Sequence, residues 1–180
     1  MPLPYGPATA VQTYVRAQPV AVHVIATAAF ASSVPLAIYA ALAAGRLHPR
    51  GAIALTGGVL AAGSLGLTGL LGWTLSRPDV GTDPALARAL YYLVFLVGGP
   101  GHLAALGLLV GGIAVPSLKL GLTPRTVARI GVAVAALAEL STSVLVWPPL
   151  AVLLPVARVA ALVWLVVIGA LLPRRNLDPV

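Results

Sequence analysis

Three ionisable side chains lie inside long apolar stretches of this sequence, where such groups are rare. Glu139 is the only glutamate of the chain, Arg158 lies in the last apolar stretch, and His102 lies in the third. An ionisable group in a membrane-spanning helix is costly and is a functional candidate by default. We therefore take His102, Glu139 and Arg158 as candidate ligand- or proton-binding residues.

The spacing of these residues predicts that they share one depth. Glu139 and Arg158 each lie nine or ten residues from the Pro148-Pro149 turn, or roughly 14 Å along a helix. Two antiparallel helices joined by so short a turn pack together, so we expect these two side chains to meet. His102 lies eleven residues after Tyr91, which is roughly 16 Å by the same rise.

Three readings of this cluster stay open. Glu139 and Arg158 form a structural ion pair that sets the register of their helices, or they form a fixed dipole beside a titrating His102. In the third reading Glu139 is protonated and bonds to Ser141 or Thr142. Small and hydroxylated residues share the helix face of Glu139, so we expect its side chain to point into the bundle.

A run of three glycines and a proline directly precedes His102. Pro100 removes a helical hydrogen bond, and Gly98, Gly99 and Gly101 make backbone carbonyls accessible. Such a helix break is tolerated in a membrane where it lines a cavity or is covered by protein. The sequence leaves open whether this helix is broken or only kinked.

Glycines at regular spacing predict close helix contacts. Gly66 lies in a glycine-rich second apolar stretch, and Gly107 and Gly111 form a Gly-x-x-x-Gly pair in the third. Small residues at such spacing let helix backbones approach. The contact is either internal to the chain or made with a second copy or a partner membrane subunit.

No pattern of catalytic or metal-binding residues is present in the sequence. The chain has no cysteine, and it lacks His-Glu-x-x-His, Gly-x-Ser-x-Gly and paired-carboxylate arrangements. His23 is expected near an interface and His102 far deeper, so the two do not suit one haem. We predict no catalytic residue, no metal and no cofactor.

The composition is that of a membrane protein. The chain is 59% hydrophobic and 8% charged, whereas soluble domains carry about 25% charged residues. The net charge of +7 comes from basic residues that lie mostly in loops, and this distribution argues against nucleic acid as a partner. The expected partner is the lipid bilayer.

These features predict an all-α, polytopic transmembrane bundle in a single domain. Residues 1–17 contain several prolines and a glycine, so an irregular leader is expected. Each apolar stretch is long enough to cross about 30 Å of hydrocarbon. The five expected transmembrane helices cover residues 20–44, 52–75, 86–115, 126–146 and 150–172.

The distribution of basic residues predicts the orientation of the bundle. Seven lie on one side and three on the other, which places the C-terminus in the cytoplasm and the N-terminus outside. Aromatic residues including Trp73, Tyr91, Tyr92 and Trp147 fall at the expected outer interface. With ten arginines against one lysine, the composition is typical of a GC-rich bacterial genome, so we expect the bacterial cytoplasmic membrane. The seven residues of the basic side are Arg46, Arg50, Lys119, Arg125, Arg129, Arg174 and Arg175.

The C-terminal part of the chain resembles a family of uncharacterised multi-pass membrane proteins of GC-rich bacteria, grouped as a domain of unknown function. The resemblance implies a multi-helix membrane fold and no particular activity. It is carried by Val97-Gly98-Gly99-Pro100-Gly101-His102, Gly107-Leu108-Leu109, Thr123-Pro124-Arg125, Ala136-Leu137-Ala138-Glu139-Leu140-Ser141, Leu154-Pro155-Val156-Ala157-Arg158 and Trp164-Leu165.

The first functional hypothesis is a non-enzymatic accessory or structural membrane component that acts through partners. The second is a protein that binds or transports a small anionic or amphipathic ligand at His102, Glu139 and Arg158. The third is a membrane enzyme that acts on a lipophilic substrate.

Overall fold

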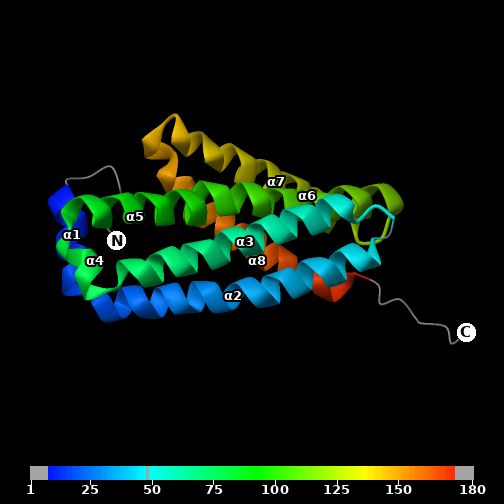
Figure 1. Ribbon diagram of the computed structural model, residues 1–180. Helices are drawn as coiled ribbons and strands as arrows, with labels where there is room; N and C mark the ends of the chain where they lie inside the picture. Colours follow the sequence, from blue (N-terminus) through cyan, green and yellow to red (C-terminus); the bar gives the residue numbers. More distant parts are fainter. Residues whose placement is uncertain (1–7, 48, 173–180) are drawn as a thin grey trace, which may run out of the picture.

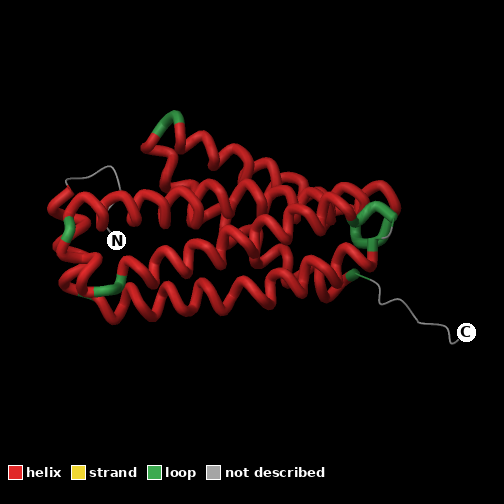
Figure 2. Tube along the Cα trace, in the orientation of Figure 1, coloured by secondary structure: helices red, strands yellow, loops and turns green. Residues whose placement is uncertain are grey.

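The computed structural model describes residues 8–47 and 49–172, and these residues form helices joined by short turns, with no strand among them (Figure 2). Residues 1–7, Arg174 and Arg175, which entered the sequence predictions, lie outside the described residues, as do residues 48, 173 and 176–180. The helices are α1 (Ala8–Ala17), α2 (Pro19–Arg46), α3 (Ala52–Leu75), α4 (Pro78–Thr82), α5 (Pro84–Leu96), η1 (Val97–Gly101), α6 (His102–Leu120), α7 (Arg125–Ser141), η2 (Thr142–Leu145), η3 (Pro148–Val152) and α8 (Leu153–Leu171).

The prediction of an all-α membrane bundle is confirmed. Five helical segments of the described chain are long and apolar enough to cross a bilayer. They correspond to α2, α3, the continuous run α5–η1–α6, α7 with η2, and η3 with α8. The protein is therefore a polytopic helical membrane protein.

The third span is longer than predicted. It runs for 37 residues from Pro84 to Leu120, about 55 Å at 1.5 Å per residue. The predicted helix stopped at residue 115, directly before Pro116, but this proline lies inside the last turns, and the helix ends where Gly121 takes a φ of 64°. Glycine adopts this left-handed conformation without strain and commonly follows a helix end.

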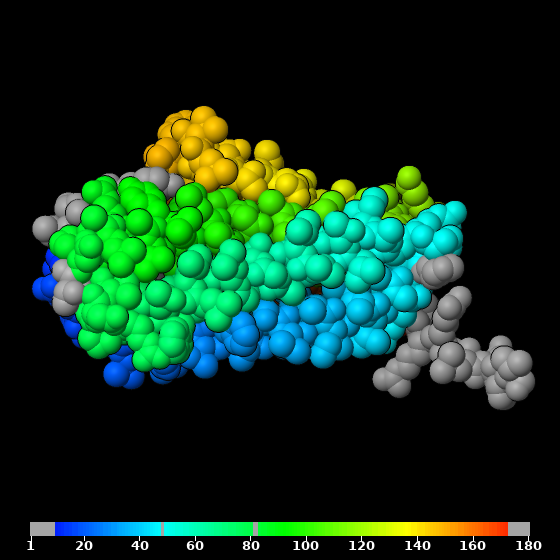
Figure 3. Space-filling view, in the orientation of Figure 1, coloured from blue at the N-terminus to red at the C-terminus, as the bar shows by residue number. Residues whose placement is uncertain are grey.

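The centre of the bundle is α6. Leu103, Leu106, Leu109 and Ile113 are completely buried, because α3, α7 and α8 all pack against this helix. Helix α2 packs chiefly on α3, and Figure 3 shows α2, α3 and α5 as adjoining layers of one face of the molecule. Much of the rest of the surface is apolar, as contact with lipid requires.

The leader differs from the irregular segment that was expected. Residues 8–17 form helix α1, which lies across one end of the bundle (Figure 1). Val11 and Val15 are buried against Leu75, Ala87 and Tyr91 of α3 and α5. The prolines that suggested irregularity are confined to residues 2, 4, 7 and 19, so they leave the amphipathic stretch between residues 7 and 19 free to be helical.

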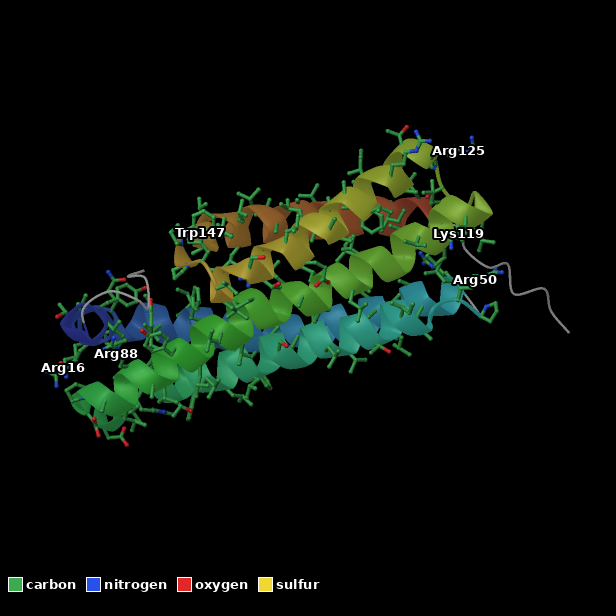
Figure 4. The ribbon with its side chains drawn as sticks, turned by 90° about the horizontal axis from the view of Figure 1, so that it is seen from above. Arg16, Arg50, Arg88, Lys119, Arg125 and Trp147 are labelled. Carbon is green, nitrogen blue, oxygen red and sulfur yellow. The ribbon has the colours of Figure 1, made fainter. Side chains whose placement is uncertain are left out.

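The α7–α8 hairpin does not reach the end of the bundle that α1 covers. In Figure 1, α7 diverges from α5 and α6 towards its turn with α8. Figure 4 shows Trp147, at the tip of this hairpin, well short of Arg16 and Arg88, whereas Arg50, Lys119 and Arg125 gather at the opposite end. A groove lies between residues 139–145 of this hairpin and residues 96–104 of the third span.

Candidate functional site

The run of glycines and proline forms one π-helical turn, η1, within an otherwise continuous helix. The amide of His102 bonds to the carbonyls of Val97 and Gly99, whereas in a regular α-helix it would bond to Gly98. Pro100 has no amide to donate. The third span is thus neither broken nor simply kinked: it contains a π-bulge, a feature that is frequent at functional sites.

Arg158 binds the carbonyl that this π-bulge exposes. Its guanidinium, which is half-buried, donates a hydrogen bond from Nη2 to the carbonyl oxygen of Gly98. The Nε atom of the same group is buried without a hydrogen-bond partner. The bond ties α8 to η1 and provides a partner for a carbonyl oxygen that the bulge deprives of its helical amide.

His102 joins α6 to α3 on another side of the bulge. The imidazole is 3% exposed, and its Nδ1 lies 3.0 Å from the carbonyl oxygen of Ala61. Because a carbonyl oxygen only accepts, Nδ1 carries the proton in this contact. The ring is therefore a buried interhelical hydrogen-bond donor.

Glu139 does not point into the bundle as predicted. Its side chain is exposed, and the carboxylate lies over Gly107, where an added methyl group would come within 2.8 Å of Oε1. The prediction relied on the small residues Ala128 and Ala135, which do face the bundle, Ala128 being fully buried and Ala135 half-buried. It fails at Glu139 because the neighbouring Ala138, which is fully buried, is the residue that faces α6 at this level, and Glu139 lies about 100° further around the helix.

A groove of about 430 Å³ lies beside Glu139. One wall is formed by the third span, through Leu96, Pro100, Gly101 and Ala104. The other wall is formed by Glu139, Thr142 and Leu145. The groove opens on the outer surface of the bundle, so in a membrane it faces the acyl chains.

The predicted ion pair between Glu139 and Arg158 is not formed. Within the part of the chain that the structure describes, the guanidinium bonds to Gly98, while the carboxylate faces the groove. The depth argument placed both residues near η1, where they are. It did not take account of their direction around the helices, which puts them on different sides of the π-bulge.

The three predicted site residues therefore surround one structural element without facing one cavity. His102 follows η1 and faces α3, Arg158 reaches η1 from α8, and Glu139 lies beside Pro100 and Gly101 from α7. The sequence analysis missed the groove walls Leu96 and Leu145, which carry no signal beyond hydrophobicity.

The predicted packing glycines contact helices of this chain. A Cβ atom at Gly107 would lie 3.1 Å from that of Ala138, and one at Gly111 would lie 3.4 Å from that of Ala135, both in α7. One at Gly66 would lie 3.4 Å from the Ser33 hydroxyl in α2. These glycines thus bring α6 close to α7 and α3 close to α2.

At the end covered by α1, polar and aromatic side chains form a separate group. His23 Nδ1 lies 3.2 Å from the Ser76 hydroxyl, and Arg77 stacks 3.6 Å above the ring of Trp73. Tyr91, which the sequence places near the outer interface, is largely buried beneath α1. Across residues 8–47 and 49–172, no cluster of three or more metal-ligating side chains occurs.

Comparisons of the chain with protein-family models, with curated proteins and with solved structures found no match.

Proposed function

We propose that this protein is a non-catalytic membrane subunit that binds a transmembrane helix of another protein in the groove beside Glu139. One observation carries the proposal: within the described chain, this carboxylate is exposed at membrane depth and makes no hydrogen bond or ion pair. Glu139 lies eight residues before Trp147, about 12 Å along the helix.

The cost of this position argues for a partner. An isolated acidic group at such a depth costs about 2–3 kcal/mol, and acyl chains provide no hydrogen-bond donor. A short glutamate side chain cannot reach the interface as lysine or arginine does. A basic, amide or hydroxyl group on a neighbouring helix would satisfy the carboxylate and remove this cost.

The shape of the groove favours a helix as the occupant. Its lining includes the small residues Gly101 and Ala104, and such a surface lets another helix approach closely. Leu96 and Leu145 supply apolar walls on either side. A small anionic ligand fits less well, because the groove presents a carboxylate, while Arg158 and His102 are engaged elsewhere.

The proposal includes the membrane in which the protein lies and the orientation of its helices. Arg50, Lys119 and Arg125 lie at one end of the bundle, opposite Arg16 and Arg88 (Figure 4), which supports a cytoplasmic position for the more basic end. We assign the protein to the bacterial cytoplasmic membrane, with relatives among the uncharacterised multi-pass proteins that its C-terminal part resembles.

The size of the native complex tests this proposal. In mild-detergent extracts of native membranes, the wild-type protein should migrate as a complex larger than the same chain produced alone. Glu139→Leu should dissociate the complex, and Glu139→Gln, which keeps hydrogen-bonding groups, should retain part of it. Ser143→Ala changes an exposed polar residue that does not line the groove and should retain all of it. Equal migration of wild type and Glu139→Leu would contradict the proposal.

A further inference from the structure

A crevice between α2 and α8 lies at the end of the bundle where basic residues gather. It has a volume of about 240 Å³, and its lining includes Tyr39, Leu42 and Arg46 of α2 and Val166 and Gly169 of α8. It is separate from the Glu139 groove. The two helices make few direct contacts, so the crevice opens between them.

Two hydrogen bonds hold this crevice in shape. The Tyr39 hydroxyl donates to the carbonyl oxygen of Leu165 over 2.7 Å, and Nη1 of Arg46 donates to that of Gly169 over 3.2 Å. Gly169 is needed for the first contact, because a Cβ atom there would lie 3.0 Å from the Tyr39 ring. The site is therefore built from side chains that are fixed between two helices.

The Arg46 guanidinium has donors left for an anion. It carries five N–H groups, and its one hydrogen bond in the described chain is that to Gly169. That bond caps the C-terminal end of α8, and it leaves the other N–H groups of Arg46 without a role. Glu139, Asp79 and Asp83 are the acidic residues that the structure describes, and all three lie away from this end: Asp79 and Asp83 belong to α4 and its C-terminus at the opposite end (Figure 1), and Glu139 lies in the groove beside η1. Arg50, Lys119 and Arg125 make this end strongly basic (Figure 4).

The walls of the crevice suit a hydrocarbon chain. Leu42 is 61% exposed and Val166 is 74% exposed, and both flank the opening on the side away from the helix end. A guanidinium at the rim of the membrane above an apolar channel matches a molecule with an anionic head and an acyl tail. Basic pockets between transmembrane helices bind anionic lipid head groups in this way.

We propose that this crevice is a binding site for an anionic glycerophospholipid, whose phosphate is bound by Arg46 and whose acyl chain lies along Leu42 and Val166. The planar guanidinium forms two parallel hydrogen bonds with a phosphate. The proposal is independent of the function proposed for Glu139.

Native mass spectrometry of the purified full-length protein tests this site. Phosphatidylglycerol should bind in preference to phosphatidylcholine with the same acyl chains. Arg46→Gln should weaken phosphatidylglycerol binding by about fivefold to tenfold. Arg50→Gln removes the same charge from the following turn, where the side chain is exposed, and should have a much smaller effect.

Two further measurements separate this lipid site from simpler explanations. Leu42→Trp keeps Arg46 but fills the apolar channel at an exposed position, so it should also weaken lipid binding. Glycerol phosphate, which has the head group without acyl chains, should not compete at equal concentration. A wild-type protein without preference for phosphatidylglycerol, or equal losses in Arg46→Gln and Arg50→Gln, would overturn the proposal. If Arg46→Gln does not fold, an unchanged affinity in Leu42→Trp would overturn it equally.

Discussion

The three ionisable residues around η1 have different surroundings, although all three lie within membrane-spanning helices. Arg158 is bound to a carbonyl that the π-bulge frees, and His102 bonds across to α3. Glu139 is left facing outward. The first two therefore act on the stability of the bundle, and only the third is available for another molecule.

Replacing His102 should lower stability by a small, measurable amount. His102→Leu removes the hydrogen bond to Ala61, and interhelical hydrogen bonds in membrane proteins contribute about 0.6 kcal/mol and at most about 1.7 kcal/mol. We expect a loss in the free energy of unfolding within that range, measured by denaturant titration in bicelles. His102→Gln retains a donor and should lose less. An equal loss in both variants would mean that ring packing, and not the hydrogen bond, is what matters.

At the scale of the helices, glycines determine how closely α3 and α6 approach. A Cβ atom at Gly57 would lie 2.4 Å from the backbone nitrogen of Leu109, whereas nothing lies within 4 Å of one at Gly63. Both glycines belong to α3, so their helical conformation is the same and only their surroundings differ.

This difference gives a matched pair of substitutions. Gly57→Ala should destabilise the protein by about 1–3 kcal/mol or more, because backbone must move. Gly63→Ala should be neutral or stabilise it by up to about 1 kcal/mol, because alanine favours helix. Thermal unfolding in detergent compares the two. Similar midpoints for both variants would show that α3 and α6 are not in the close contact described.

The π-bulge adds one residue to the third span, so it predicts a tolerated deletion. Without Gly99, the amide of His102 still reaches the carbonyl of Val97, now in an α-turn, and that of Leu103 reaches Gly98. We expect a folded protein that is destabilised by about 1–3 kcal/mol, because Arg158 loses its acceptor.

Deletion of Ala104 is the control for this experiment. It lies in regular helix, so removing it rotates the following residues by about 100° and displaces the buried leucines of α6. That variant should fail to elute as a single species in size-exclusion chromatography. If both deletions behave alike, η1 does not contain a surplus residue.

The helices were predictable from the sequence because each apolar stretch is long and bounded by turn residues. The π-bulge was only partly predictable: Pro100 and its glycines locate a disturbance, but which carbonyl becomes free depends on how the helix closes around it. Helix α1 was missed because its burial depends on α3 and α5, and their ends meet only in the folded bundle.

At the scale of the whole molecule, the position of a side chain along its helix was predictable from the sequence, whereas the direction in which it points around the helix was not. Counting residues from a turn placed Glu139 and Arg158 correctly near η1. At the level of Glu139, the fully buried Ala138 is the residue that faces α6, so Glu139, about 100° further around the helix, faces outward. Which side of α7 faces α6 results from side-chain packing along two whole helices, for which residue spacing gives no measure.

The orientation of the bundle can be measured directly because the chain has no cysteine. Single substitutions Arg50→Cys and Lys119→Cys should be protected from a membrane-impermeant thiol reagent applied to intact cells, if the more basic end is cytoplasmic. Arg88→Cys, at the opposite end (Figure 4), should react. Labelling of Arg50→Cys and protection of Arg88→Cys would reverse the proposed orientation.

The measurement that tests the central claim most directly is photocrosslinking from the groove in native membranes. A benzophenone side chain at Leu145, a groove wall that is 60% exposed, should form one protein adduct of defined mass, and Glu139→Leu should abolish it. The same probe at Val24 on α2, which is similarly exposed, should form none. Lipid adducts alone, an adduct that persists in Glu139→Leu, or an adduct of twice the chain's own mass would contradict binding of another subunit at Glu139.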